Sequence, residues 1–242
     1  MRLLACLLAW LPLAAGAISP DLKVSTDDLN EKGEHFVEFQ ANKASRAGPA
    51  LDDARVPFQV LAEYSYGITD HWQVAVKLPF ARESGLKSLG GSMEVRYLPA
   101  HDATKGGYWG VDFSAGRARA LPRDPQVSAM DIQPVLGYRA WGWHFAANLG
   151  VSFPGSGEDR RATFATKLKA GRRVGEHELG VEHFLEGGPV RDALPRSQRR
   201  EYLFFVWDKV VGNELNVGLG RGLTDSSERW IIKAVYSFQI FK

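Results

Sequence analysis

Apolar and polar residues alternate with a period of two along most of this chain, and that pattern restricts its fold more than any other feature. The run WQVAVKLPF, which begins at Trp72, places its large apolar side chains on one face of an extended strand and Gln73 and Lys77 on the other. The run WHFAANLGVSF, which begins at Trp143, follows the same rule, as does the weaker row Tyr202, Phe204 and Val206. The sequence therefore predicts an all-β chain of about twelve strands.

Two architectures contain many alternating strands: a soluble sandwich or barrel with its apolar rows inward, and a membrane barrel with those rows outward. Strands of soluble sheets average about 5 to 6 residues, whereas a tilted membrane strand needs about 9 to 11. The runs here approach the longer value, and an even number of strands suits an outer-membrane barrel. We therefore expect a single antiparallel up-and-down transmembrane β-barrel of about 12 strands, with its apolar rows outward.

The lengths of the connections and the positions of the tryptophans both support a membrane barrel. Outer-membrane barrels alternate short periplasmic turns with longer external loops. Long connections are predicted at 44–56, 82–90, 118–126, 154–161 and 187–198, and short ones at 67–71, 141–142, 174–176 and 209–213. Two are of medium length: 99–107, a near-tie at the periplasmic end, and 222–229 at the external end. Aromatic girdles mark both membrane interfaces of such barrels, and the tryptophans beside shorter connections are Trp72, Trp109, Trp141, Trp143 and Trp207, with Trp230 beside an external one.

The N-terminus reads as a targeting segment. Arg2 precedes an apolar run from Leu3 to Leu13, and small residues end at Ala17, a pattern typical of a cleaved secretory signal peptide. A lipoprotein signal around Cys6 is the alternative, but too few residues precede that cysteine. The predicted organisation is a signal peptide at 1–17, a periplasmic N-terminal lead at 18–32 and the barrel at 33–242, located in the cell outer membrane.

The inward face should carry the function. Its charged residues are balanced, so they do not indicate ion selectivity, and they are consistent either with a solute pathway or with a salt-bridged, closed lumen that serves a structural role. The predicted lumen-lining residues are Glu38, Glu63, Lys77, Glu94, Arg96, Asp112, Arg139, His144, Asn148, Lys167, Lys169, Glu178, Glu182 and Lys233.

No catalytic or metal site is predicted. His144 and Ser152 share a strand face, but at a rise of about 3.4 Å per residue they would be about 27 Å apart, too far for a nucleophile and its base. The histidines do not have metal-ligand spacing, and Cys6, the one cysteine, lies in the signal peptide. We therefore expect no cofactor and no enzymatic activity, a lipid-modifying hydrolase at the rim being the less favoured alternative.

Arginines are frequent in the predicted external loops. A guanidinium group binds phosphate through a bidentate fork, so we expect contacts with the phosphates of lipopolysaccharide. The net charge of +2 gives no reason to expect nucleic acid as a partner. The residues expected at lipopolysaccharide are Arg117, Arg119, Arg160, Arg161, Arg199 and Arg200.

Several turn-and-strand motifs can be set against known families: EYSYGITDHWQVAVKLP at 63–79, GGSMEVRYLP at 90–99, the run from Leu215 to Asp225 and the terminal Tyr236-Ser237-Phe238. These motifs resemble a bacterial outer-membrane family associated with the meta-pathway of phenol degradation. The resemblance implies an outer-membrane location and a link to aromatic compounds, and it provides no catalytic residues. The barrel assembly machinery should read the C-terminal strand, although Lys242 follows the aromatic Phe241.

Together these features favour a passive channel for small organic solutes, aromatic ones among them. The alternative is a structural or surface-interaction barrel with a closed lumen.

Overall fold

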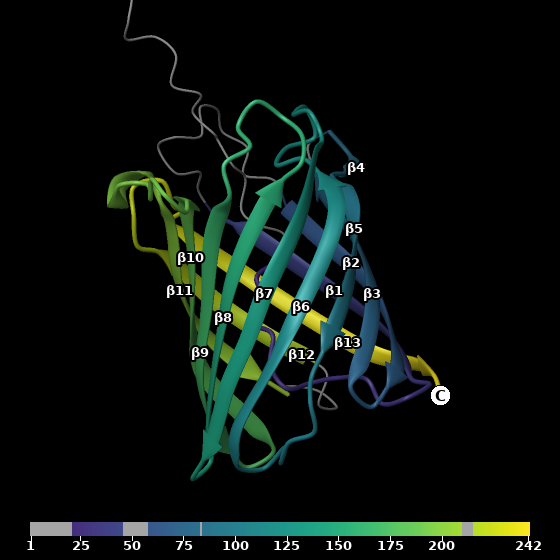
Figure 1. The fold of residues 1–242 in the computed structure, drawn as a ribbon. Coiled ribbons are helices and arrows are strands. Elements are labelled where there is room, and N and C mark those ends of the chain that lie inside the picture. The colour runs from purple at the N-terminus through teal and green to yellow at the C-terminus, as the bar shows by residue number, and fades with distance from the viewer. Residues whose placement is uncertain (1–20, 46–57, 83, 210–214) are drawn as a thin grey trace, which may run out of the picture.

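The computed structural model describes residues 21–45, 58–82, 84–209 and 215–242. Figure 1 shows these residues as tilted antiparallel strands around a central space, with the longer connections at one end and the tighter turns at the other. The predicted signal peptide lies outside the described residues. Within them, no helix is long and apolar enough to cross a bilayer.

The sheet closes on itself as a barrel of twelve long strands. Each strand pairs with its sequence neighbours, and β1 pairs with both β2 and β13, which joins the two ends of the chain. The strands are β1 (His35–Ala44), β2 (Phe58–Thr69), β3 (Trp72–Arg82), β5 (Gly90–Tyr97), β6 (Gly106–Ala118), β7 (Val127–Ala140), β8 (Trp143–Pro154), β9 (Thr163–Val174), β10 (His177–Pro189), β11 (Arg200–Asp208), β12 (Leu215–Gly222) and β13 (Trp230–Phe241).

Two short elements lie at the long-loop end. Strand β4 (Leu86–Ser88) pairs with the last residues of β3 just before β5 begins, so β4 and β5 continue one interrupted edge along β3. A single 3-10 turn, η1 (Arg196–Gln198), lies in the connection between β10 and β11. The predicted fold class, a closed antiparallel barrel of about twelve strands, is confirmed.

The turns alternate in length as the sequence predicts, except between β5 and β6, where the connection 98–105 is as long as 119–126 at the other end. The connection from β7 to β8 consists of Trp141 and Gly142, both with positive φ (51° and 79°), which matches the twist of a two-residue hairpin. The connections from β2 to β3 and from β9 to β10 are equally short, whereas the intervening ones at the other end are longer. Five tryptophans lie at or near the short-turn end, as expected: Trp72, Trp109, Trp141, Trp143 and Trp207.

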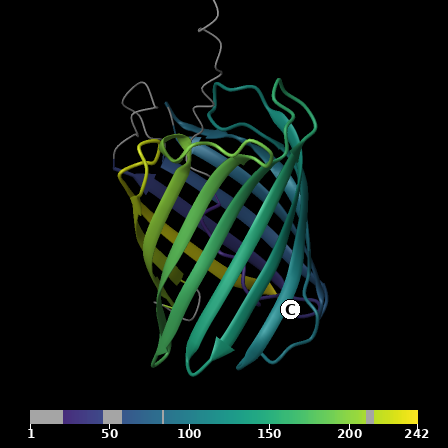
Figure 2. The same ribbon diagram turned by 60° about the vertical axis from the view of Figure 1, so that its left-hand side comes forward.

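The outward face is apolar along most strands. Large apolar side chains such as Leu78, Leu136, Phe145 and Ile232 are exposed on the outside of the barrel, and their inward neighbours are buried. Figure 2 shows the tilted strands that present this surface. The apolar rows were expected outward, and the structure has them there for most of the wall.

Strand β11 is the exception and corrects the expectation. Tyr202, Phe204 and Val206 point into the barrel and are at most 1% exposed, whereas Leu203 and Phe205 point outward. Both faces of this strand are apolar, so a period-two pattern cannot determine which face is inside. The inside of the barrel is therefore partly apolar along β11.

Candidate functional site

A stretch of extended chain occupies the barrel lumen. Residues 21–30, which we call the lumen segment, run inside the barrel before the chain turns into β1 (Figure 1). Leu22 and Val24 are almost completely buried there. The sequence predicted a periplasmic lead at 18–32, and nothing in its pattern placed residues 21–30 inside the lumen.

One anchor joins the middle of the lumen segment to the wall at β8. The backbone N–H of Ser25 donates to Oδ1 of Asn148 at 2.7 Å, and Nδ2 of Asn148 donates to the Ser25 carbonyl at 2.9 Å. Asn148 is fully buried, so this pair of bonds fixes the segment as a neighbouring strand would. The Ser25 hydroxyl also accepts from Nη2 of Arg96 at 2.9 Å.

A second anchor lies toward the short-turn end. The Asp27 carboxylate accepts two hydrogen bonds from Arg139, at 2.5 and 3.0 Å, in the fork geometry that suits a carboxylate. His101 Nε2 is 3.2 Å from the same carboxylate, and His144 Nε2 is 3.8 Å from it. The side chain of Asp27 is only 3% exposed. This carboxylate therefore links the segment to two wall strands and one connection.

Asp21 and Lys23 carry opposite charges, and each forms an ion pair with the barrel wall near the start of the lumen segment. Asp21 lies 3.2 Å from Lys167 and 3.7 Å from Lys77, and Lys23 Nζ lies 2.5 Å from Glu38. Burial on its own raises the pKa of the Asp21 carboxyl, but the ammonium groups of Lys167 and Lys77 outweigh it and bring that pKa below its usual range. Burial lowers the pKa of Lys23, but Glu38 and Glu63 outweigh that effect and raise it.

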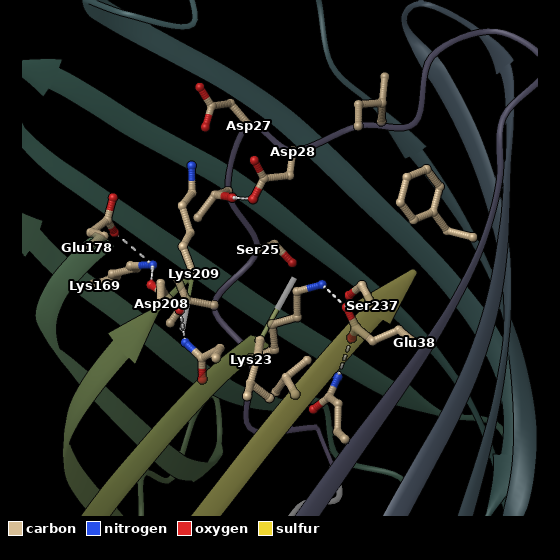
Figure 3. Close-up of a pocket in the computed structure, with 18 of the residues that line it drawn as sticks. Lys23, Ser25, Asp27, Asp28, Glu38, Lys169, Glu178, Asp208, Lys209 and Ser237 are labelled. Carbon is tan, nitrogen blue, oxygen red and sulfur yellow. Dashed lines mark hydrogen bonds and ion pairs between the residues drawn. The ribbon is translucent and has the colours of Figure 1, made fainter. Parts of the chain in front are cut away.

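The wall has further ion pairs of its own. Lys77 lies 2.7 Å from Glu94 and 3.8 Å from Glu63, and Arg96 forms a fork with Asp112 at 2.7 and 2.9 Å. Figure 3 shows a neighbouring group, in which Lys169 reaches Glu178 at 2.9 Å and also pairs with Asp208. The lumen is thus crossed by charge pairs that hold both the wall and the segment.

All fourteen residues expected to line the lumen lie on the inward face in the structure. Most bond to the lumen segment or to one another, as described above. The other contacts include His144, whose Nε2 is 2.8 Å from the Tyr108 hydroxyl, and Lys233, which pairs with Glu182. Sequence reasoning missed Asp208, Tyr108 and Asp27. The first two are polar groups near strand ends, where period two gives little information, and the third belongs to the segment.

The arginines expected at lipopolysaccharide are in different surroundings. Arg160 and Arg161 are exposed, with Arg161 paired to Asp159 at 2.8 Å, and Arg117 is exposed near the end of β6. The Arg119 and Arg199 guanidinium groups donate to the carbonyls of Pro122 and Leu194. Arg200 differs from the expectation. It is the first residue of β11 and, two positions before Tyr202, its side chain points to the same inward face. It is buried, with its guanidinium 3.8 Å from Glu186.

Space remains beside the segment. A cavity of about 520 Å³ lies between the lumen segment and the inward side chains of β1, β10 and β13, among other strands (Figure 3). Charged groups dominate its lining, including Lys23, Glu38 and Lys169. Within the described residues there is no cluster of three or more side chains suited to hold a metal ion.

The fold and the lumen together define a class: a closed twelve-stranded outer-membrane-type barrel with a chain segment inside it. The same fold occurs in the COG4313 outer membrane channel from Pseudomonas putida F1, with a TM-score of 0.64, 12% identity, and coverage of 90% of this chain and 100% of that one. At that identity the likeness concerns the fold. Neither a protein-family model nor a curated protein sequence matches the chain.

Two further barrels are more distant. The translocator domain of the autotransporter NalP from Neisseria meningitidis has a TM-score of 0.45 at 13% identity, covering 89% of this chain and 90% of that one. OccK11 (OpdR) from Pseudomonas aeruginosa has a TM-score of 0.41 at 13% identity, covering 84% and 63%. Neither adds to the argument at these TM-scores.

Proposed function

We propose that this protein is a passive outer-membrane channel for small organic solutes, and that its lumen segment narrows the pathway. One observation carries the proposal: a closed barrel with an apolar, tryptophan-flanked exterior surrounds a charged lumen in which a cavity of about 520 Å³ remains beside the segment. The exterior suits a bilayer and the lumen suits water and polar solutes. The fold shared with a Pseudomonas putida channel supports the same assignment.

The charges favour weak ion selectivity. The predicted wall residues include six acids and six bases, and the lumen segment adds Asp21, Asp27 and Asp28 against Lys23. A pathway with this balance would pass neutral solutes without a strong preference for either ion sign. The resemblance of residues 63–79 to the phenol meta-pathway family supports organic solutes that include aromatic ones.

The proposal includes location and partners. Cleavage of residues 1–17 would deliver the chain to the periplasm, and the barrel assembly machinery would insert it through its last strand, β13. Of the six predicted arginines, Arg117, Arg160 and Arg161 are exposed and lie at the long-loop end, where they would meet lipopolysaccharide phosphates. No enzymatic reaction is part of the proposal, since His144 and Asn148 are engaged by Tyr108 and by the segment.

Planar-bilayer recording and liposome swelling test the channel. Purified barrel that shifts on heating in a gel should give discrete current steps and admit small uncharged solutes to liposomes. A variant that lacks residues 21–30 should give larger steps, because the lumen would lose its occupant. If neither protein gives current or swelling, the barrel is a structural or surface-interaction protein. Lipid hydrolysis by the purified protein would instead indicate an enzyme at the rim.

A further inference from the structure

An apolar surface lies among the charged groups of the lumen wall on β10 and β11. Phe184 of β10 and Phe204 of β11 pack edge to face, with ring centroids 5.5 Å apart at 81°. Tyr202, Val206 and Ile231 extend this surface, which we call the apolar lumen patch, and all five residues are at most 5% exposed. An apolar surface inside a water-filled pathway is costly unless something covers it.

Leu22 and Val24 of the lumen segment are buried in the same cluster as Phe184 and Phe204. The Leu22 side chain is 2% exposed. Its carbonyl oxygen accepts a hydrogen bond from Lys233 Nζ at 2.8 Å. Leu22 therefore presents the patch with two groups at once: a branched apolar side chain and one acceptor oxygen.

Lys233 determines the polar part of this site. Its Nζ lies 5.2 Å and 5.3 Å from the ring centroids of Phe184 and Phe204, and the side chain is 1% exposed. Glu182 already neutralises its charge through an ion pair. If Leu22 leaves, the ammonium loses a carbonyl acceptor but keeps its counter-charge, so a neutral acceptor oxygen fits better than a second anion.

Two glycines of β12 allow this close packing. A Cβ atom at Gly220 would be 2.4 Å from a ring atom of Phe204, and one at Gly218 would be 2.9 Å from Cε of Lys233. The aromatic ring and the lysine stem thus lie directly against the β12 backbone. The space that Leu22 vacates suits one small ring or a short branched chain.

We propose that the apolar lumen patch with Lys233 is a binding subsite for small neutral organic solutes that combine an apolar ring or branched chain with one acceptor oxygen. Leu22 is its resident occupant, and the solute displaces it. This inference rests on the proposed channel function and specifies the solute that the channel would select.

Direct binding of a fluorinated probe tests the subsite without relying on transport. The probe is 4-fluorobenzyl alcohol, and 4-fluorotoluene, which has no acceptor oxygen, is its matched partner. Fluorine NMR titration of the full-length protein in detergent, with empty micelles as the baseline, measures the affinity for each. We expect the alcohol to bind and to compete with the segment.

Variants separate the subsite from general partitioning. Leu22→Ala should tighten alcohol binding about tenfold, because a weaker occupant leaves the subsite free more often. Leu61→Ala is the control, since Leu61 is an equally buried inward leucine of β2 that does not belong to the patch cluster. The double variant Lys233→Met with Glu182→Met removes the donor without leaving a lone buried charge, and it should abolish the preference for the alcohol over the toluene.

Currents from the same preparations separate this inference from the channel itself. Equal affinities in the wild type, Leu22→Ala and Leu61→Ala, or an alcohol preference that survives the double variant, would overturn the subsite even if the barrel conducts. Binding that follows the expected order in a barrel without current would support the subsite and refute the channel.

Discussion

The double hydrogen bond between Asp27 and Arg139 should govern how often the lumen segment leaves the pathway. The perturbation is Asp27→Asn, which keeps the shape and one acceptor oxygen but removes the charge. Arg139 keeps 19% of its side chain exposed, so water replaces part of what it loses. Charge-assisted hydrogen bonds contribute about 1.5 to 3 kcal/mol each, and breaking a fully buried ion pair costs about 3 to 5 kcal/mol.

This pair is partly exposed and keeps one hydrogen bond in Asp27→Asn, so we take about 2 kcal/mol as the free energy by which the substitution weakens docking of the segment. Since each 1.4 kcal/mol is tenfold, the ratio of undocked to docked segment should rise about 30-fold. Single-channel recording at fixed voltage measures this ratio as the relative dwell time in the high-conductance state. The high-conductance level itself should be the same in both proteins, because the open pathway is unchanged.

A carboxylate at the same end of the barrel provides the control. Asp102 lies in the connection between β5 and β6, is exposed, and bonds to Thr104 of its own loop at 2.8 and 2.5 Å. Asp102→Asn should therefore leave the dwell times unchanged. The reasoning fails if Asp27→Asn has wild-type dwell times while deletion of residues 21–30 enlarges the current, since docking would then depend on other contacts.

Three further results are expected. Burial raises the pKa of the Asp21 carboxyl, but Lys167 and Lys77 bring it below its usual range, so the Asp21 charge stabilises the docked segment above about pH 4 and stops doing so as the pH falls toward the lowered pKa. Acidification below pH 4 should therefore favour the high-conductance state in wild type, and less so in Asp21→Asn. Equal responses of the two proteins would count against this pairing. Gly220→Val should lower the temperature of the heat-induced gel shift, because even a Cβ atom there meets Phe204 at 2.4 Å, whereas Gly150→Ala, with its nearest contact at 3.6 Å, should not. Phe205→Arg on the outward face of β11 should destabilise the barrel in lipid by about 2 to 4 kcal/mol if residue 205 lies near the bilayer midplane. Urea titration in vesicles measures this loss. An unchanged midpoint would mean that Phe205 faces the lumen and not the lipid.

The sequence predicted the barrel because most strands have one apolar face. Trp143 and Phe145 alternate with polar or small residues, so a single assignment satisfies the whole strand, and the two-residue connection at Trp141 and Gly142 follows from its position between two alternating runs. In β11 the rule fails, since Phe204 and Phe205 are equally apolar. Parity there depends on pairing with β10 and β12, which is long-range information that no local pattern contains.

The lumen segment escaped prediction for a related reason. The sequence DLKVSTDDLN at 21–30 mixes apolar and charged residues, as a solvated linker would. Its burial becomes favourable only when the closed wall offers Asn148 to the Ser25 backbone and Arg139 to Asp27. These partners are more than a hundred residues away in sequence. Arg200 was misplaced in the same way, because its inward direction follows from the parity of β11.

The wall's own ion pairs indicate which contact holds the segment most strongly. When the segment leaves, Lys77 still has Glu94 at 2.7 Å, so losing Asp21 at 3.7 Å costs it little. Arg139 differs, since its ion pair among the described residues is with Asp27. Lys167 and Glu38 also have their ion pairs among the described residues with the segment, to Asp21 at 3.2 Å and to Lys23 at 2.5 Å. Undocking would therefore leave these two charges and the Arg139 guanidinium without their partners. The wall's own pairs, Lys77 with Glu94 and Arg96 with Asp112, do not involve the segment, so they would persist when it dissociates.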